Sequence, residues 1–389
     1  MKKYNLAYIT KEDSRNRKEW SGSSYNIYNC LVKSGHNVKR YGPFNTFFEK
    51  ILKLVELFYK FFKIKFDPDR NIFLSKYIAK KIEKEIKGKN LDFIIVHDCP
   101  IISFVKTDIP IVIWTDLTFD LYQKTYFSNF KHFHKQSLKS GHYLEKLSLS
   151  RAKIVIYTTE YAKMNAEKKY QIDKDKIKIL AFGSDMKPIT KGQFLSIIKK
   201  NKKIKKTYKF ISVGVEWKRK NMSKSIQVIE ELNKKGFDST LKIIGAKPPD
   251  NFIKPEYVQI VPFLNKTNNA EFNKLKKIYL SSDFFILLSE AEAFGLVIQE
   301  ANSYALPLVL NNIGGMKFAS SDKYTIFVDK KLPPEKIAIK IIDLIKKPKK
   351  YEKFRLNSYE SSFDKSWDIV SNKIGKILKN TYSELRNSN

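Results

Sequence analysis

Two glutamates flank a glycine in the second half of the chain, in the segment Glu292-Ala-Phe-Gly-Leu-Val-Ile-Gln-Glu300. A strand-length apolar run precedes the segment and a helical pattern follows it, which puts Glu292 in a loop and Glu300 on a helix. Gly295 permits close approach of the backbone, and free amides at a helix start bind anions. Carboxylates on both sides of an anion site can accept hydrogen bonds from two polyols. A nucleotide sugar has this layout, whereas the alternative is two ordinary solvent-facing carboxylates.

A cationic loop follows the first strand expected in this half, in the segment Gly214-Val-Glu-Trp-Lys-Arg-Lys-Asn221. Fixed Arg and Lys donors stabilise the negative charge that grows on a pyrophosphate leaving group. Arg219 and Lys220 are therefore candidates for that task, and a basic surface loop is the alternative. A Gly314-Gly315 pair further along predicts either a phosphate contact or a plain turn.

Three short segments of the first half also carry polar groups next to expected strand ends. Gly22 lies between the first strand and the first helix, where it predicts a close approach to a phosphate or an acceptor, and the alternative is a simple helix N-cap by Ser21 or Ser23. His97 and Asp98 end a buried strand, and a histidine in that place is as often structural as functional. Asp116 follows the next strand and is a candidate to hold an acceptor hydroxyl.

The Glu292 to Glu300 segment resembles the Glu-x7-Glu signature of retaining GT-B glycosyltransferases of the family-4 type, also called group 1. The resemblance implies that Glu292 contacts hydroxyls of the donor sugar and that Glu300 contacts the ribose. It places Lys220 in a phosphate loop in which Val215 stands where many members have Arg, so Arg219 is expected to replace that guanidinium. The resemblance implies further donor contacts from Phe294, Gly295, Leu296, Gly214, Gly22, Gly314 and Gly315. It implies that His97 is a catalytic residue, as Glu292, Lys220 and Arg219 are. Asp98 and Asp116 are implied on the acceptor side.

These groups need a scaffold that brings strand ends together. Apolar runs of strand length alternate with helical patterns along the whole chain, which predicts two parallel sheets built from strand-helix-strand units. Ligands of such sheets bind outside the carboxyl ends of the strands. We therefore expect the GT-B fold: α/β, with two Rossmann-like, doubly wound domains facing a cleft. The expected domains are an acceptor domain (1–205), a donor domain (206–355) and C-terminal helices (356–389) that pack back on the first domain.

Composition limits the classes of function. The chain of 389 residues carries a formal charge of +34, which raises nucleic-acid binding as an alternative. Lys is spread along the whole sequence, however, and no recognition helix or aromatic sheet motif is evident. The basic run from Lys199 to Lys206 is expected to be a solvated linker. Only two cysteines are present, which favours a reducing compartment and gives no metal-ligand cluster.

One amphipathic segment, Ile51–Phe66, is both basic and aromatic. At 100° per residue, Lys53, Glu56, Lys60 and Lys63 form a narrow polar stripe, and almost everything else is apolar. Such a helix can lie on an anionic membrane surface, or it can be buried against the first domain. We find no signal peptide and no apolar run long enough to span a bilayer.

Together these observations predict an enzyme of the cytoplasm, either free or peripheral at the inner face of the membrane. It is expected to move a sugar with retention from a nucleotide-diphosphate sugar to a glycan or a lipid-linked acceptor, without a cofactor or a metal. The alternatives are a basic nucleic-acid-binding protein and a non-catalytic GT-B relative. Donor sugar, nucleotide base, acceptor and oligomeric state are not determined by the sequence.

Overall fold

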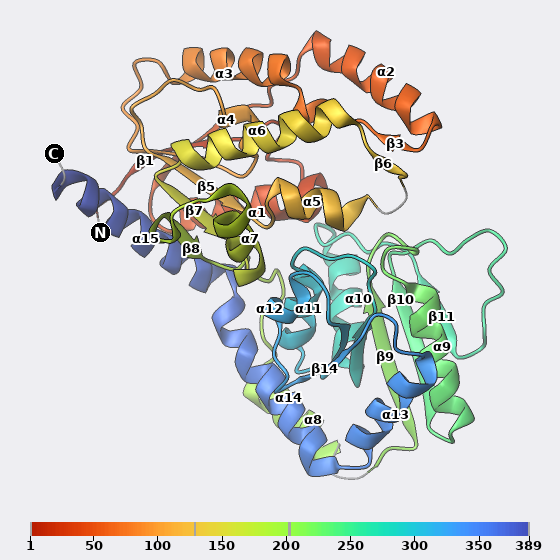
Figure 1. Ribbon diagram of the computed structural model, residues 1–389. Helices are drawn as coiled ribbons and strands as arrows, with labels where there is room; N and C mark the ends of the chain where they lie inside the picture. The colour runs from red at the N-terminus through yellow and green to blue at the C-terminus, as the bar shows by residue number, and fades with distance from the viewer. Residues whose placement is uncertain (1, 128–129, 201–203, 388–389) are drawn as a thin grey trace. The chain divides into compact units, whose positions relative to one another are not determined.

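The computed structural model describes residues 2–127, 130–200 and 204–387. The chain divides into two compact units. Unit 1 comprises residues 1–182 together with 367–389, and unit 2 comprises residues 183–366. Each unit has a parallel sheet covered by helices (Figure 1).

The described part of unit 1 forms a six-stranded sheet in the order β2-β1-β4-β5-β7-β8, with every pairing parallel. Its strands are β1 Asn5–Ile9, β2 Asn37–Tyr41, β4 Phe93–Val96, β5 Ile111–Thr115, β7 Ile154–Tyr157 and β8 Ile177–Ile179. A separate parallel pair joins β3 Ile64–Lys65 to β6 His132–Phe133. The helices are α1 Ser23–Lys33, α2 Phe47–Phe61, α3 Ile72–Ile86, α4 Cys99–Ile102, α5 Phe119–Tyr126, α6 Lys135–Arg151, α7 Glu160–Tyr170 and α15 Trp367–Asn387, with short 3-10 turns at Glu19–Gly22, Pro68–Arg70 and Lys174–Lys176.

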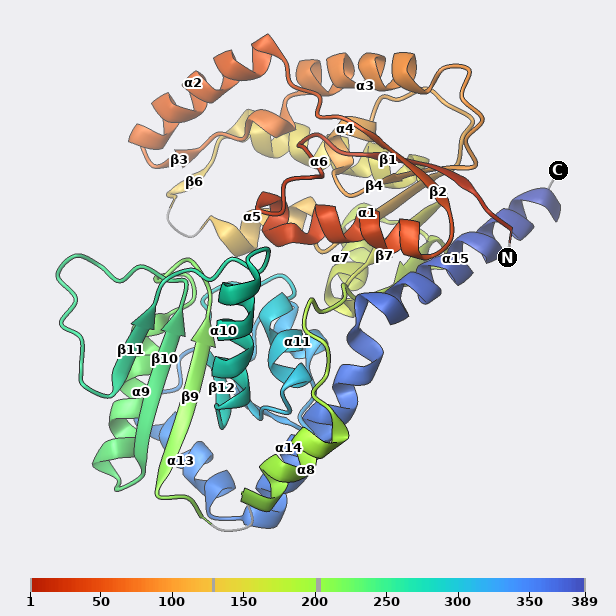
Figure 2. The ribbon, with the colours of Figure 1, turned by 180° about the vertical axis from the view of Figure 1, so that it is seen from behind.

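Unit 2 has a second six-stranded parallel sheet among its described residues, in the order β11-β10-β9-β12-β13-β14 (Figure 2). Its strands are β9 Thr207–Val213, β10 Asp238–Ile244, β11 Val258–Val261, β12 Phe284–Leu287, β13 Leu308–Asn311 and β14 Thr325–Val328. Its helices are α8 Lys191–Lys200, α9 Met222–Lys234, α10 Asn269–Leu280, α11 Leu296–Ser303, α12 Met316–Ala319, α13 Pro334–Ile345 and α14 Pro348–Ser362, followed by a 3-10 turn at Phe363–Lys365.

Hydrophobic periodicity explains how helices cover the sheet of unit 2. On α9 the apolar residues Ile226, Ile229 and Leu232 recur at intervals of three, and all are buried in the core below. The inner strands are apolar on both faces, as β12 shows with four buried residues in succession. A parallel sheet covered on both faces requires this composition. The predicted doubly wound α/β class is therefore confirmed.

The unit boundaries fall at different residues from the expected domain boundaries. Residues 183–205 and 356–366 belong to unit 2 by their contacts. Ser303 on α11 donates to the carbonyl of Met186, and Ile189 donates to the carbonyl of Ser303. These hydrogen bonds attach the segment before α8 to unit 2. The helix α15 packs on α1 within unit 1.

The basic run expected as a linker is partly helical. Lys199 and Lys200 end α8, and β9 begins at Thr207. Residues 201–203 of that run lie outside the described residues. Of residues 204–206, Lys205 is half-buried and pairs with Asp283, so only Ile204 and Lys206 are exposed as a solvated linker would be.

Strand order locates a binding edge in each unit. In unit 2 the chain proceeds outward from β9 to β10 and β11, then returns to place β12 on the other side of β9. In unit 1 the same reversal separates β1 from β4. Loops diverge at such a switch point and leave a crevice at the carboxyl ends of the strands. The loops that follow β9 and β12, and those that follow β1 and β4, are thus where chemistry is expected.

Candidate active site

Lys220 lies in the loop that leaves the carboxyl end of β9. Its side chain is 8% exposed, so it is not part of a basic surface loop. The loop makes room for it through Gly214, because a Cβ at residue 214 would lie 2.7 Å from Cγ of Lys220. The sequence therefore places a residue without a side chain where the Lys220 stem must pass. The role of Gly214 in the structure is thus to leave space for the side chain of Lys220.

Glu292 lies in the loop that leaves the carboxyl end of β12, on the other side of the switch point. Its side chain is 9% exposed and forms an ion pair with Lys220. Arg219 adds a second cation, with Nη1 3.5 Å from Oε2 of Glu292. Two cations thus share one buried carboxylate. The alternative of a solvent-facing Glu292 is wrong.

Backbone and amide contacts hold the two loops together. The amide of Glu290 donates to the carbonyl of Arg219 over 2.7 Å, and Nη1 of Arg219 donates to the carbonyl of Ala291 over 3.1 Å. Asn221 Nδ2 donates to Oε1 of Glu290 over 2.7 Å. Arg219 also pairs with Glu216, at 2.7 Å. Arg219 therefore already holds the two loops against each other.

The Gly314-Gly315 pair lies behind Glu292. A Cβ at Gly314 would lie 2.3 Å from the carbonyl oxygen of Glu292, and Gly314 has a φ of +51°. Gly315 donates its amide to the same carbonyl over 3.3 Å. This turn is therefore required by the backbone of Glu292, whatever further contact it makes.

Glu300 lies within α11, the helix that begins just after Gly295. It is 2% exposed, so it too is not a solvent-facing carboxylate. Oε1 forms an ion pair with Lys266, and Oε2 accepts a hydrogen bond of 3.0 Å from the hydroxyl of Tyr279. Burial disfavours the charge of Lys266, but Glu300 and Asp185 outweigh this effect and raise its pKa. Burial and the neighbouring Glu300 raise the pKa of Tyr279.

Lys266 and Tyr279 were missed by the sequence reasoning. Lys266 follows β11 and precedes α10, so it lies in a loop at the carboxyl edge of the sheet, as the other site residues do. That placement was the available signal. Tyr279 lies in the last turn of the amphipathic helix α10, where nothing in the sequence distinguishes it from a core residue.

The structure joins three of the four main predicted residues directly: Arg219, Lys220 and Glu292. Glu300 contacts Tyr279 on α10 and Lys266 in the loop before α10. It is linked to Glu292 through the start of α11. At that start Gly295 has a φ of +79°, and a Cβ there would lie 2.9 Å from Ile298. Phe294 is buried beside it and Leu296 is half-buried.

In unit 1, His97 follows β4 at the other switch point. The indole of Trp20 stacks on its ring with centroids 4.6 Å apart, and the hydroxyl of Tyr8 lies 3.3 Å from Nδ1. Tyr8 donates its proton to the carbonyl of Ser24 over 3.0 Å, so Nδ1 of His97 is the donor to Tyr8. Burial lowers the pKa of His97 to about 4, which keeps its ring neutral at pH 7.

Trp20 reaches His97 through an unusual turn. Trp20, Ser21 and Gly22 have φ values of +44°, +55° and +84° in succession. Two non-glycine residues in the left-handed region are strained, and such strain is characteristic of functional loops. Gly22 serves as the N-cap of α1, where no side chain caps the helix. The alternative of a simple serine cap is thus wrong.

Carboxylates gather near His97. Burial raises the pKa of Asp98 to about 6, and burial together with the charge of Asp98 raises the pKa of Glu12 to about 7. Lys11 follows β1 and pairs with Glu49 at 3.0 Å and with Asp69. Asp116 follows β5 and is half-buried. Asp98 and Asp116 therefore both end strands at the carboxyl edge of this sheet.

A cavity of about 400 Å³ lies at the opposite, amino edge of the unit 2 sheet. Lys205, Lys209, Asp283 and Arg355 line it. Asp283 is paired with Lys205 and lies 3.8 Å from Nη1 of Arg355, so one carboxylate is shared by two of the three cations that line this cavity. We place the candidate site at the carboxyl edge, because the strand order and the shared Glu292 both point there.

Within the described residues, no three His, Cys, Asp or Glu side chains gather as metal ligands would. The expectation of a reaction without a metal stays a prediction. The same holds for the roles of the site residues toward a donor or an acceptor.

Comparison with known proteins agrees with this architecture. Residues 193–361 match the family of glycosyl transferases group 1. A protein of Haemophilus influenzae described as an uncharacterized glycosyltransferase is 26% identical over 88% of this chain and 92% of its own length. The O-antigen chain mannosyltransferase RfbU of Salmonella typhimurium is also 26% identical, over 44% of this chain and 45% of its own length.

A solved structure shows the same fold. The crystal structure of Anabaena HepE in complex with UDP-glucose superimposes with a TM-score of 0.60. It covers 97% of this chain and 100% of that chain at 14% identity. The two Rossmann-like units are those of a GT-B protein.

Proposed function

We propose that this chain, whose residues 193–361 match the family of glycosyl transferases group 1, moves a sugar from a nucleoside-diphosphate sugar to a glycan or lipid-linked acceptor with retention of configuration. The supporting observation is the pairing of Lys220 and Arg219 with Glu292 across the switch point of unit 2. A site of this polarity suits a ligand that presents both phosphates and hydroxyls. HepE, which shares the fold, was crystallised with UDP-glucose.

Lys220 and Arg219 bind the diphosphate of the donor. In the free protein Glu292 and the exposed Glu216 balance these two cations, and the diphosphate takes the place of the carboxylates when the donor binds. As the bond from the sugar C1 to the phosphate oxygen breaks, negative charge grows on that oxygen. Fixed cations in a site shielded from water stabilise this charge.

Glu292 orients the sugar, and Glu300 holds the ribose. Both carboxylates lie in or just before α11, whose first amides remain available for an anion. Glu292 exchanges part of its ion pair with Lys220 for hydroxyl groups when the donor binds. Lys266 keeps Glu300 ionised, so that it accepts hydrogen bonds from the ribose.

The acceptor is bound at the carboxyl edge of the unit 1 sheet. Asp98 and Asp116 accept hydrogen bonds from its hydroxyls. A neutral His97 cannot supply a proton at pH 7, so it acts as a hydrogen-bond acceptor through Nε2. In the transfer step the acceptor oxygen bonds to C1 on the face that the phosphate leaves. The hydroxyl proton passes to the departing phosphate oxygen, so no separate base and no metal is required.

We place the enzyme in the cytoplasm, at the inner face of the membrane, where lipid-linked acceptors are used. RfbU, an O-antigen chain mannosyltransferase, matches 44% of the length of this chain. By analogy with that relative, the acceptor of this chain is a cell-surface polysaccharide or its precursor.

Anomeric analysis of the product tests this proposal. The protein is incubated with an α-linked nucleotide sugar and a lipid-linked glycan extract, and the new linkage is examined by NMR. We expect an α-linkage and loss of product with Lys220→Met. A β-linked product would contradict retention, and product formation by Lys220→Met at the normal rate would contradict the assigned site.

A further inference from the structure

Helix α2 of unit 1 presents its apolar side to the solvent. Five large apolar residues recur at intervals of four and three along it, and their exposed fractions range from 45% to 84%. They are Phe47, Ile51, Leu54, Phe58 and Phe61. Phe48, Leu57 and Phe62 extend this face on both sides and are exposed as well. We call these eight residues the apolar face of α2.

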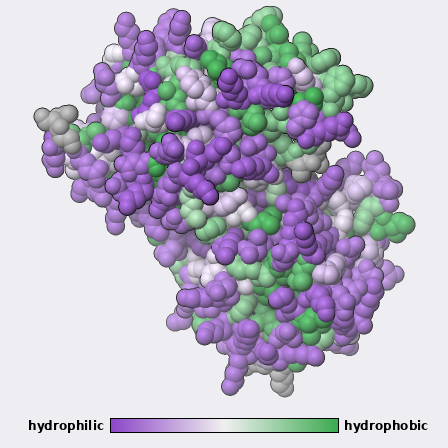
Figure 3. Space-filling model, viewed as in Figure 1, coloured by the Kyte–Doolittle hydropathy of each residue, from purple (hydrophilic) through white to green (hydrophobic). Residues whose placement is uncertain are grey.

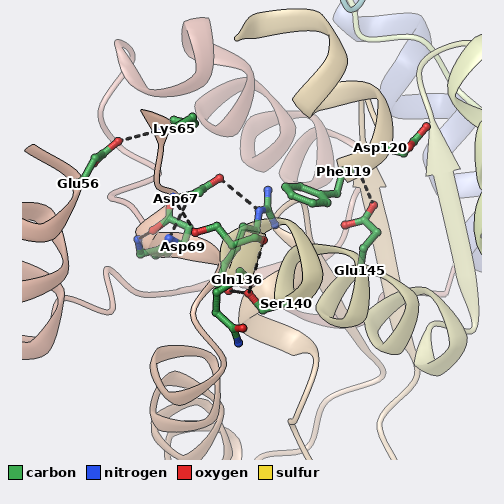
Figure 4. Close-up of polar contacts among 12 residues, drawn as sticks. Glu56, Lys65, Asp67, Asp69, Phe119, Asp120, Gln136, Ser140 and Glu145 are labelled. Atoms are coloured by element: carbon green, nitrogen blue, oxygen red, sulfur yellow. Dashed lines mark hydrogen bonds and ion pairs between the residues drawn. The ribbon is translucent and has the colours of Figure 1, made fainter. Parts of the chain in front are cut away.

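The opposite side of α2 faces the protein and carries two carboxylates among apolar and aromatic side chains. Glu49 is 8% exposed and pairs with Lys11, and Glu56 points toward Lys65 and pairs with it at 2.5 Å (Figure 4). Leu52 is buried between them, and the ring of Tyr59 contacts that of His134 in a tilted arrangement, with ring centroids 4.6 Å apart. Most of the large apolar side chains of α2 thus face outward, whereas a surface helix usually turns its apolar side inward. The expected alternative, a helix buried against its domain, is wrong.

The boundaries of the helix also differ from those expected. It runs from Phe47 to Phe61 and not from Ile51 to Phe66. Thr46 caps its start by accepting from the amide of Glu49 over 3.1 Å, and Lys63 leaves it with a φ of +58°. Lys63 is thus not on the helical stripe. The cap and the two inward ion pairs fix the helix in place without any use of its apolar face.

Figure 3 shows hydrophobic residues gathered over α2. An exposed apolar patch of this size marks an interaction surface. Lysines adjoin the face, because Lys50, Lys53, Lys60 and Lys63 are all exposed. A second copy of this chain is a poor occupant, since both copies carry a formal charge of +34 and would bring these lysines together. An anionic bilayer receives both the apolar side chains and the lysines.

We propose that the apolar face of α2 inserts into the interface of an anionic lipid bilayer, with the adjoining lysines among the headgroups. Among the described residues, no helix is long and apolar enough to cross a bilayer. The contact is therefore made by a helix lying in the plane of the membrane. Lys11 connects this helix to the carboxyl edge of the unit 1 sheet, because it pairs with Glu49 and follows β1. A bilayer bound by α2 would therefore lie next to the element that leads to the carboxyl edge of the unit 1 sheet, where an acceptor is expected.

Vesicle co-sedimentation tests this inference without any donor or acceptor. It goes beyond the proposed reaction, so its failure leaves the reaction untouched. The full chain is mixed with phosphatidylglycerol-containing vesicles or with pure phosphatidylcholine vesicles. We expect at least tenfold stronger binding to the anionic vesicles, and weaker binding at high salt. The triple variant Leu54→Glu, Phe58→Glu, Phe61→Glu is expected to lose at least tenfold of that binding.

A matched variant separates charge from position. Met164→Glu, Leu195→Glu, Ile253→Glu makes the same change of charge at three other exposed apolar residues, away from α2. This control is expected to bind within about threefold of the unaltered chain, and both triple variants are expected to melt near its melting temperature. Equal loss in the two triple variants would overturn the proposal. So would equal binding to both kinds of vesicle, or a dimer in sedimentation equilibrium that only the α2 variant dissociates.

Discussion

Replacement of Lys220 by Met is expected to destabilise unit 2 strongly. The side chains of Lys220 and Glu292 are 8% and 9% exposed, so the substitution leaves a buried carboxylate with one partner fewer. Breaking a buried ion pair by removing one member costs roughly 3–5 kcal/mol of unfolding free energy. Because Nη1 of Arg219 remains 3.5 Å from Glu292, we expect the lower end of that range, about 3 kcal/mol.

Scanning calorimetry of the full chain measures this effect. For a unit the size of residues 183–366, about 3 kcal/mol lowers the melting temperature by roughly 6–12 °C. Lys234→Met is the matched control. Lys234 pairs with Glu230 and Glu231, but its side chain is 58% exposed and such pairs contribute little.

The double variant Lys220→Met, Glu292→Gln completes the test. Removing both charges eliminates the uncompensated carboxylate, so most of the lost stability should return. The pair would then serve ligand binding rather than stability. The reasoning is refuted if Lys220→Met lowers the melting temperature no more than Lys234→Met does, or if the double variant is less stable than either single variant.

Four further predictions concern the site. Gly214→Ala adds a Cβ 2.7 Å from Cγ of Lys220, and the resulting displacement of that side chain should reduce kcat/KM about 100-fold. Gly192→Ala is the control, because a Cβ at residue 192 has no atom within 4 Å, and it should leave kcat/KM unchanged. Glu300→Gln should weaken nucleotide binding in calorimetry about tenfold or more, because the ribose loses a charged acceptor; an unchanged Kd would contradict its role. Burial lowers the pKa of His97 to about 4, so as pH falls from 6.5 toward 4 the unfolded chain gains a proton that the folded chain does not, and stability falls. The pKa of Asp98 is raised to about 6, so this residue acts in the opposite direction and stabilises the folded chain as the pH falls. His97→Gln removes the destabilising contribution of His97. Between about pH 7 and about pH 5, the melting temperature of this variant should therefore fall less than that of the unaltered chain. EDTA should leave the transfer rate unchanged, and restoration of a lost rate by added Mg²⁺ would show that a metal is required.

Most of the fold could be predicted from the sequence because parallel strands buried on both faces are continuous apolar runs. The alternation of apolar runs and helical patterns predicted two parallel sheets, and the described residues of each unit form one six-stranded parallel sheet, whereas the short pair of β3 and β6 was not predicted. The Glu292 and Lys220 loops were identified because their residue types and their places after strands are local features. Strand order, and hence the switch point that brings these loops together, depends on pairings between distant segments and cannot be read from local pattern.

The misplaced features share a physical cause. The orientation of α2 was left open because an amphipathic pattern defines two faces without saying which one faces the protein. Only the pairing of Glu49 with Lys11, 38 residues away in sequence, settles it. Lys266 was overlooked because its place in a loop after β11 is a weak signal for one lysine among 74 Lys and Arg residues. Its partner Glu300 distinguishes it, and that contact is tertiary.

Binding of nucleotide sugars to the unaltered chain and to Lys220→Met tests the central claim most directly. Titration calorimetry with UDP-, GDP- and ADP-sugars should show saturable binding of at least one, and the same ligand should raise the melting temperature. Lys220→Met should weaken that binding at least tenfold, while Lys234→Met should not. Absence of binding for all three classes, together with salt-sensitive binding of an oligonucleotide, would contradict the claim.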